Sequence, residues 1–166
     1  RLFDAACRVE QDGVNRGGDN GTNGGEVAHD RAACRRGVLA ARELITGAGS
    51  GIGRTTAAAF VKAGWGVALV GRRPEALEET ARIIGGGLVL PADATKVDQV
   101  EAAFAKAVAA FGRLDALFNN AGRGSRPKTI DEMALEDWQA VLDVNLTGAV
   151  LCARTAFGQM RKQSPQ

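Results

Sequence analysis

Residues 46–53, Thr-Gly-Ala-Gly-Ser-Gly-Ile-Gly, are the part of this chain whose types and spacing most clearly suggest chemistry. They follow a short apolar stretch and precede an amphipathic helical pattern, the context in which a glycine loop cradles the phosphates of a nucleotide. Gly47 lets the chain turn off its strand, Gly51 lets backbone approach a pyrophosphate, and Gly53 lets the helix pack closely. The following helix directs unpaired N–H groups and its positive dipole end at the phosphates. A flexible loop without a ligand is the alternative, which the flanking pattern disfavours.

A second feature sits at the end of the next apolar run, where Gly71 is followed by Arg72 and Arg73. A carboxylate at this place would hydrogen-bond the ribose hydroxyls of NAD and repel the extra phosphate of NADP. Guanidinium groups instead pair with a 2′-phosphate, so NADP is the preferred cofactor. Ser50 offers no second basic contact, so NAD stays possible. The alternative is that the arginines only form a solvated cap beside Pro74.

The elements that must position these residues alternate between strand and helix patterns from Leu44 onward. This alternation predicts parallel strands joined by right-handed crossovers, an α/β fold with a Rossmann-type doubly wound sheet, truncated after its fourth strand and the long helix that follows. Predicted strands end at 44–46 and cover 67–70, 88–90 and 114–118, and predicted helices cover 51–63, 74–84, 97–111 and 135–161.

Packing expectations follow from the same periodicity. In the first helix Ile52, Thr56, Phe60 and Ala63 form the stripe expected to face inward. Trp138, Val141, Leu142 and Leu151 are expected to be core residues of the long helix. The fourth strand should pair with the first strand on one side and leave its other edge uncovered.

Charged residues at the start of the first strand conflict with this packing. A central buried strand tolerates charges poorly, and Arg42 and Glu43 stand where apolar residues are expected. We therefore expect the folded pattern to begin near Leu44.

Length and composition indicate one domain. The 166 residues are 45% hydrophobic and 24% charged, with a net charge of +2. Residues 1–37 are rich in glycine and arginine and are predicted to be disordered, whereas 38–166 form a partial dinucleotide-binding domain. Without a basic run we predict no nucleic-acid partner. No apolar stretch is expected to span a bilayer, so we predict no membrane partner and a cytoplasmic location.

The cysteines do not suggest a metal or a disulfide framework. Cys7, Cys34 and Cys152 are widely spaced and odd in number, and His29 with the first two lacks the spacing of a zinc site. No metal site is predicted.

Four motifs in order give a resemblance to the short-chain dehydrogenase/reductase family over roughly residues 44–162. They are the glycine loop, Asp93 after the third predicted strand, the run Asn-Asn-Ala-Gly at 119–122, and Asp-Val-Asn-Leu-Thr-Gly at 143–148 inside the long helix. Taken singly, Asp93 and the Asn pair would be turn residues and Asn145 a surface residue. Asn is a poor helix former, so it also predicts a local irregularity.

The resemblance implies roles for these residues. The family's counterpart of Asp93 contacts the adenine amino group, and Asn119 and its neighbours tie the fourth strand to the sheet and line the adenosine side. Asn145 is the implied catalytic residue, which bends its helix and holds a water in a proton relay to a catalytic Lys. The candidate cofactor-binding residues are Thr46, Gly47, Gly49, Ser50, Gly51, Ile52, Gly53, Arg72, Arg73, Asp93, Asn119, Ala121 and Gly122.

The resemblance further implies hydride transfer between NADP(H) and a small carbonyl or alcohol substrate, with a Tyr as general acid and base beside a Lys, and a Ser. The chain contains no Tyr. We expect these groups to lie past Gln166, the 166 residues to be inactive alone, and the full-length protein to be a homo-oligomer. A non-catalytic dinucleotide-binding or regulatory module is the alternative function, and an interaction fragment built on the long helix is a third.

Overall fold

The computed structural model describes residues 41–164. The segment predicted to be disordered, together with Cys7, His29 and Cys34, lies outside the described residues, as do 38–40 and 165–166.

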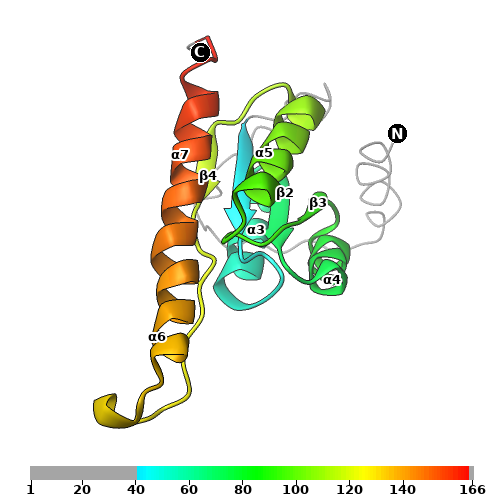
Figure 1. The fold of residues 1–166 in the computed structure, drawn as a ribbon. Helices are drawn as coiled ribbons and strands as arrows, with labels where there is room; N and C mark the ends of the chain where they lie inside the picture. The colour runs from blue at the N-terminus through cyan, green and yellow to red at the C-terminus, as the bar shows by residue number, and fades with distance from the viewer. Residues whose placement is uncertain (1–40, 165–166) are drawn as a thin grey trace, which may run out of the picture.

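Four parallel strands form one sheet at the centre of the molecule (Figure 1). Its order is β3-β2-β1-β4, and the strands are β1 (Arg42–Thr46), β2 (Gly66–Gly71), β3 (Leu88–Pro91) and β4 (Ala116–Phe118). Five of the six residues of β2 are buried, as expected for a strand covered on both faces. The predicted α/β class and doubly wound parallel sheet are confirmed, and β4 lies at the sheet's edge, with β1 as its only neighbour among the described strands.

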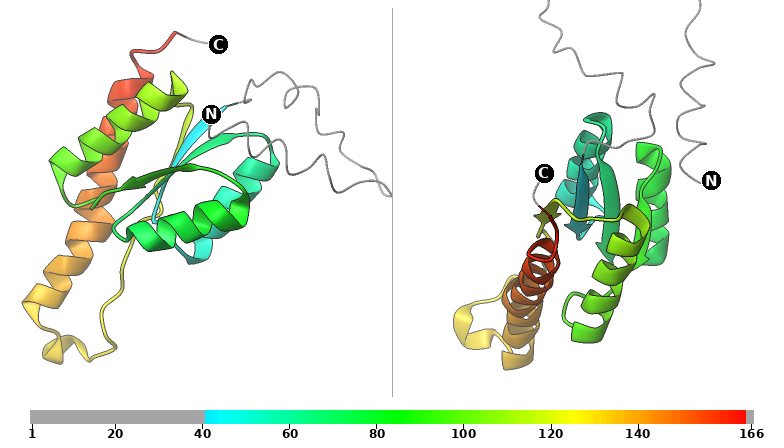
Figure 2. Two further views of the ribbon diagram at one scale, coloured as in Figure 1. Left: turned by 90° about the vertical axis from the view of Figure 1, so that its right-hand side faces the viewer. Right: turned by 90° about the horizontal axis from the view of Figure 1, so that it is seen from above.

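Helices cover both faces of the sheet, as the two further views show (Figure 2). One face carries α3 (Gly51–Lys62) and α4 (Pro74–Ile84), and the other carries α5 (Val97–Phe111) and the long helix. The long helix has three parts, α6 (Leu135–Leu142), the π-helical turn η2 (Asp143–Gly148) and α7 (Ala149–Met160). A short 3-10 turn, η1 (Ile130–Glu132), precedes it.

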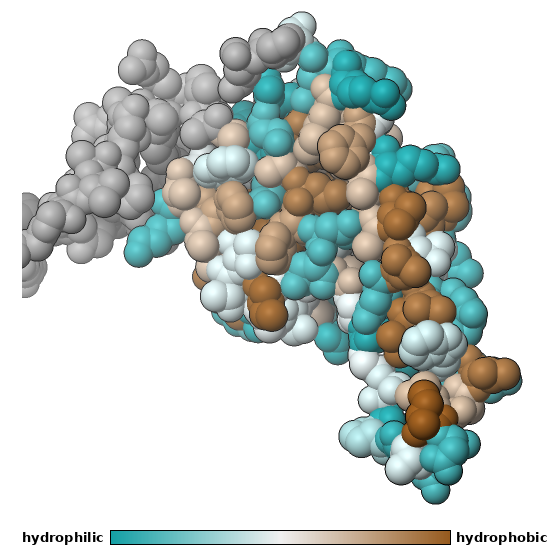
Figure 3. Space-filling view, turned by 90° about the vertical axis from the view of Figure 1, so that its left-hand side faces the viewer, coloured by the Kyte–Doolittle hydropathy of each residue, from teal (hydrophilic) through white to brown (hydrophobic). Residues whose placement is uncertain are grey.

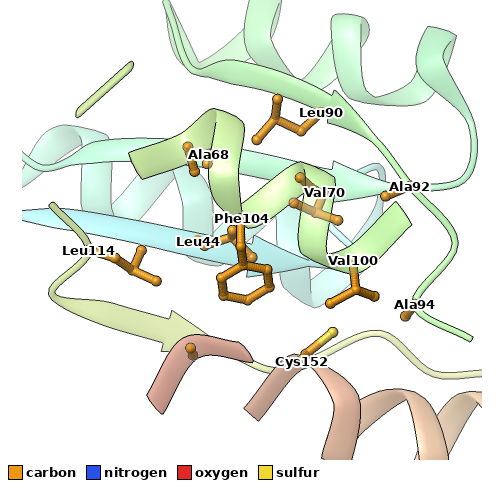
Figure 4. Close-up of a cluster of buried hydrophobic side chains, with 13 residues drawn as sticks. Leu44, Ala68, Val70, Leu90, Ala92, Ala94, Val100, Phe104, Leu114 and Cys152 are labelled. Carbon is orange, nitrogen blue, oxygen red and sulfur yellow. The ribbon is translucent and has the colours of Figure 1, made fainter. Parts of the chain in front are cut away.

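The two cores follow from the alternation of side chains along β1. Leu44 faces α5 and α7 and joins a cluster around Phe104, whereas Ile45 faces α3 and α4 with Leu69 and Leu77. Figure 4 shows the ring of Phe104 between Leu44 and Cys152. Burial raises the pKa of the Cys152 thiol to about 11, so this cysteine behaves as a small apolar side chain.

The inner face of α3 differs from the predicted stripe. Gly53 and Ala57 are its buried residues, whereas Ile52 is 71% exposed and Ala63 is also exposed. The prediction was wrong because Gly53 packs closely on the Gly47 backbone of the glycine loop, and this contact fixes the rotation of the helix. Of the four long-helix residues expected in the core, Trp138 is 48% exposed, and Val141, Leu142 and Leu151 are half-buried and belong to neither core cluster.

Both charged residues at the start of the first strand belong to β1, which corrects the expected beginning near Leu44. Arg42 donates its backbone N–H to Asp115 Oδ2 at 2.8 Å, and its guanidinium lies 5.9 Å from the ring centroid of Phe111. Glu43 is 2% exposed, and its Oε2 has no hydrogen-bond partner among the described residues. Burial raises its pKa to about 7.

The long helix corrects the statement that no apolar stretch could span a bilayer. Leu135–Met160 is long and apolar enough by length and composition alone. Its buried side packs Cys152 and Ala156 against the core shared with α5, whereas only 17% of its most apolar window is buried. The large apolar residues exposed along it are Leu135, Trp138, Leu146, Val150 and Phe157. Figure 3 shows hydrophobic surface, in brown, running along this side of the molecule.

The side chain of Gln163, just after the long helix, bonds to the backbone of Leu114, just before β4. Gln163 accepts a hydrogen bond from the Leu114 N–H at 2.7 Å and donates one to the Leu114 carbonyl at 2.8 Å. The amide thus reproduces both bonds that a neighbouring strand would make. Next to it, Arg113 pairs with Asp115 at 2.6 Å.

Candidate functional site

The carboxyl ends of the four strands meet at one edge of the sheet. After β1 the chain moves outward to β2 and β3, and it then returns to the other side of β1 as β4. The strand order therefore reverses between β1 and β4, and in open parallel sheets ligands bind at such a reversal. The loops at 46–53 and 119–122 flank it.

The glycine loop has the geometry that its sequence predicts. Gly47 and Gly51 have φ angles of +69° and +51°, a region that favours glycine. A Cβ on Gly53 would lie 2.3 Å from the Gly47 carbonyl oxygen, so the first turn of α3 packs directly on the loop. A Cβ on Gly51 would meet nothing within 4 Å, so open space remains where a phosphate could approach the helix N-terminus.

Thr46 ties the two loops together. Its hydroxyl accepts hydrogen bonds from the Asn120 and Ala121 N–H groups, both at 2.9 Å, and lies 3.5 Å from Asn119 Oδ1, to which it donates. The Asn120 side chain donates to the Thr46 carbonyl at 3.0 Å. Thr46 is fully buried, so its side chain holds the loop after β4 against the end of β1.

Asn145 fastens the long helix to the same loop. Its Oδ1 accepts the Arg123 N–H at 2.8 Å, and its Nδ2 donates to the Arg123 carbonyl at 3.0 Å. Gly122 lies close by, since a Cβ there would be 3.4 Å from Asn145 Oδ1. The irregularity predicted at Asn145 is confirmed, because it lies inside the π-helical turn η2. Such turns widen a helix locally and are frequent at functional sites.

A second contact holds the helix from the other side of the sheet edge. Asn119 donates its side-chain N–H to the Ala149 carbonyl at 2.7 Å. Gly148 is buried, and a Cβ there would lie 3.1 Å from the Ala94 carbonyl oxygen. The π-helical turn is thus held between the loops that follow β3 and β4. Sequence reasoning missed the role of Gly148, although the glycine within the motif at 143–148 was a usable signal.

The predicted charged residues, Arg72, Arg73 and Asp93, follow β2 and β3, on the side of the sheet away from β4. Arg72 and Arg73 are exposed directly after β2, and Arg72 lines a shallow depression of about 260 Å³ with Asp93 and Gln99. Asp93 Oδ1 accepts two hydrogen bonds from Thr95, each 2.9 Å long.

The charge state of Asp93 follows from these neighbours. Partial burial opposes its ionisation, but the hydrogen bonds from Thr95 and the positive charges of Arg72 and Lys96 outweigh it, so the Asp93 pKa is lowered. Gln99 accepts the Asp93 N–H at 2.8 Å and fixes the turn. Sequence reasoning did not single out Gln99.

Two further side chains, which sequence reasoning also missed, donate hydrogen bonds to the carbonyls of the glycine loop. Arg54 of α3 donates to the Gly49 carbonyl at 2.7 Å and to the Thr80 hydroxyl at 3.0 Å. Thr80 of α4 is fully buried and donates to the Ala48 carbonyl at 3.0 Å. Neither residue belongs to a motif, so nothing in their spacing marked them.

The predicted residues therefore gather along one sheet edge in two groups. The glycine loop, the 119–122 run and Asn145 form a connected unit at the strand reversal, while Arg72, Arg73 and Asp93 lie beside it at the ends of β2 and β3. Within residues 41–164 no cluster of His, Cys, Asp or Glu could hold a metal ion.

A parallel α/β sheet with a glycine loop at its strand reversal defines a Rossmann-type fold suited to a nucleotide. A family model described as short chain dehydrogenase matches residues 42–165, which includes Arg42 and Glu43. The chain belongs to the short-chain dehydrogenase/reductase family.

Individual relatives agree. Serine 3-dehydrogenase of Agrobacterium fabrum is 43% identical over 106 residues, covering 63% of this chain and 43% of that protein. A 3-oxoacyl-(acyl-carrier-protein) reductase of Synechocystis is 37% identical over 125 residues, 72% of this chain and 50% of that protein. The chain spans about half the length of the curated relatives that it matches.

A solved structure agrees as well. The 3-ketoacyl-(acyl-carrier-protein) reductase from Brucella melitensis complexed with NADH has a TM-score of 0.72 and 35% identity, covering 74% of this chain and 51% of that chain. These relatives are named as dehydrogenases or reductases, and the Brucella structure is a complex with NADH.

Proposed function

We propose that this chain is the cofactor-binding portion of an NADP-preferring oxidoreductase acting on a small carbonyl or alcohol. The observation that carries the proposal is the glycine loop, whose open face at Gly51 lies at the strand reversal beside the N-terminus of α3. When bound, the nicotinamide ring supplies or accepts the hydride. The chain's own residues bind and orient the dinucleotide.

Each candidate residue then has a task. The N–H groups around residues 49–53 bind phosphate, and exposed Ile52 contacts the dinucleotide beside them. Asp93 reads the adenine, and the backbone of Ala121 and Gly122 lines the path toward the nicotinamide. Buried Thr46 and the doubly bonded side chain of Asn119 support the site from within rather than touching the ligand.

Asn145 is proposed to serve catalysis through its backbone. Both ends of its side-chain amide are engaged with Arg123, so the π-helical turn that it anchors is the part able to hold a water. The 166 residues contain no Tyr for the acid and base step. We therefore propose cofactor binding without turnover for this polypeptide alone. A cytoplasmic location and a homo-oligomeric full-length protein, using the apolar side of the long helix, complete the proposal.

The preference for NADP rests on Arg72 and Arg73, which are exposed at the end of β2 with no carboxylate between them and the loop. Titrating NADPH and NADH into the chain and following cofactor fluorescence tests the preference. Arg72→Gln and Arg73→Gln should each weaken NADPH about tenfold and leave NADH nearly unchanged, because one charge-assisted hydrogen bond is lost. Arg82→Gln, an exposed arginine further along α4, is the matched control and should change neither. Equal binding of both cofactors by all variants would refute the preference.

A folded wild-type sample that binds neither cofactor would refute the function itself. The regulatory alternative predicts the same binding, so it is separated by assaying the complete gene product for hydride transfer to carbonyl compounds.

A further inference from the structure

Arg54 and Thr80 form a side-chain clamp that the proposed function does not yet use. We define the clamp by three hydrogen bonds, two to loop carbonyls and one between the two side chains: Arg54 to the Gly49 carbonyl at 2.7 Å, Thr80 to the Ala48 carbonyl at 3.0 Å, and Arg54 to the Thr80 hydroxyl at 3.0 Å. The Ala76 carbonyl of the same helix lies 2.9 Å from this hydroxyl, so the single O–H of Thr80 is shared between the Ala48 and Ala76 carbonyls. Two consecutive loop carbonyls are thus bound by side chains, one from α3 and one from α4.

The clamp fixes the direction of the loop's donors. In a trans peptide the C=O and the following N–H point in opposite directions, and no described peptide bond is cis. Holding the carbonyls of Ala48 and Gly49 therefore turns the N–H groups of Gly49 and Ser50 away from the clamp side chains. Within residues 41–164 neither of these two N–H groups donates to a chain atom. They remain available to a ligand.

The clamp also joins the loop to the arginine pair. Gly49 packs so closely on α4 that a Cβ there would lie 3.0 Å from the Ala76 Cβ. Arg73 is the residue that precedes α4, and Pro74 is the first residue of that helix. The loop amides and the arginines are thus held to the same first turns of α4 without any direct bond between them.

We propose that Arg54 and Thr80 are positioning residues that determine the preference between NADP and NAD, by holding the Gly49–Ser50 edge of the loop in register with Arg72 and Arg73. This inference rests on the proposed function. Here the N–H groups of Gly49 and Ser50 are assigned to the 2′-phosphate of NADP, and those of residues 51–53 to the pyrophosphate that both cofactors share. A shifted Gly49–Ser50 edge would leave a 2′-phosphate with the arginines alone, whereas NADH has no such group to lose. Disrupting the clamp should therefore reduce NADPH affinity more than NADH affinity.

The test measures the ratio of NADPH to NADH dissociation constants for the 166-residue chain by fluorescence titration, with folding checked by circular dichroism. Thr80→Val removes the hydroxyl at nearly constant volume and should weaken NADPH about tenfold while changing NADH less than threefold. Thr80→Ser restores the hydroxyl and should recover the wild-type ratio within about twofold. Arg54→Met should resemble Thr80→Val, and the double variant should be no worse than either single one.

Thr155→Val is the matched control, because Thr155 of α7 makes a comparable bond to the Leu151 carbonyl at 2.9 Å, outside the clamp. It should leave the ratio unchanged. Folded Thr80→Val and Arg54→Met proteins with the wild-type ratio would overturn the inference while leaving the proposed function intact. If Thr80→Val does not fold, Arg54→Met decides. A folded wild-type chain that binds neither cofactor refutes the proposed function and this inference with it.

Discussion

Thr46 and Glu43 lie three residues apart in β1, and both side chains are buried, yet they are treated in opposite ways. The Thr46 hydroxyl is engaged by three groups of the loop after β4, whereas Glu43 Oε2 has no partner among the described residues. A satisfied buried polar group rigidifies its surroundings, and an unsatisfied one costs stability. The carboxyl end of β1, where the candidate site lies, is therefore held rigid, while the buried carboxyl near its amino end lowers the stability of the fold.

The strongest disruption of the carboxyl edge is Gly53→Ala. The added Cβ would lie 2.3 Å from a backbone oxygen that cannot move without changing the loop. We expect a loss of roughly 4 kcal/mol or failure to fold, and no NADPH binding. Urea denaturation and fluorescence titration measure both effects. Gly124→Ala, where a Cβ meets nothing within 4 Å, should match wild type. Wild-type stability in Gly53→Ala would show that the close packing does not hold in solution.

Thr46→Val tests the hydrogen bonds that the Thr46 hydroxyl makes with the loop after β4. It leaves the Asn120 and Ala121 N–H groups without their acceptor, so about 3 kcal/mol of the unfolding free energy should be lost, together with much of the cofactor affinity. Thr46→Ser keeps the oxygen and should lose far less. Wild-type stability of Thr46→Val, measured by urea denaturation, would show that these hydrogen bonds do not contribute to the unfolding free energy.

Near the amino end of β1, replacing Glu43 should stabilise the protein, and the effect should depend on pH. Its folded pKa of about 7 lies above the ordinary value of 4.5, so the protonated form is the one favoured by folding. The stability contribution is complete below pH 4.5 and is lost as the pH rises through 7. Glu43→Gln cannot ionise and should remove roughly 2 kcal/mol of pH-dependent destabilisation between pH 5 and 8. Denaturation at a series of pH values checks this, and parallel curves for the two proteins would contradict it.

The smallest expected effect belongs to Asn145. Its two bonds to the Arg123 backbone are exposed, so Asn145→Ala should cost about 1 kcal/mol of unfolding free energy. Hydrogen exchange should nevertheless increase at 119–124, because the loop loses its attachment to the π-helical turn. Thr147→Ala, an exposed neighbour in the same turn, serves as the control. Unchanged exchange in Asn145→Ala would separate the turn from the site.

The sequence predicted what local pattern can encode. The helix at 97–111 was predicted with its observed bounds, because apolar residues recur at helical spacing along it. The glycine loop and the turn at Asn145 were also anticipated, since each glycine and the Asn have local conformational consequences.

Features that depend on rotation or on distant partners were not predictable. Ile52 faces outward because Gly53 must face the Gly47 backbone and Asn120, a packing constraint that overrides the apolar stripe. Arg54 and Thr80 are 26 residues apart and meet only because two helices share one face of the sheet. Glu43 was flagged as misplaced, but nothing local indicated that the strand would accept it by raising its pKa.

The attachment of Gln163 to Leu114 has a consequence for how the protein opens. The two residues are 49 positions apart, so their paired bonds close a circuit that contains β4, the loop after it and the whole long helix. Unwinding of the last helical turn must break this circuit before it can release the strand. The exchange rate of one amide proton, that of Leu114, would therefore report how often the long helix and β4 separate.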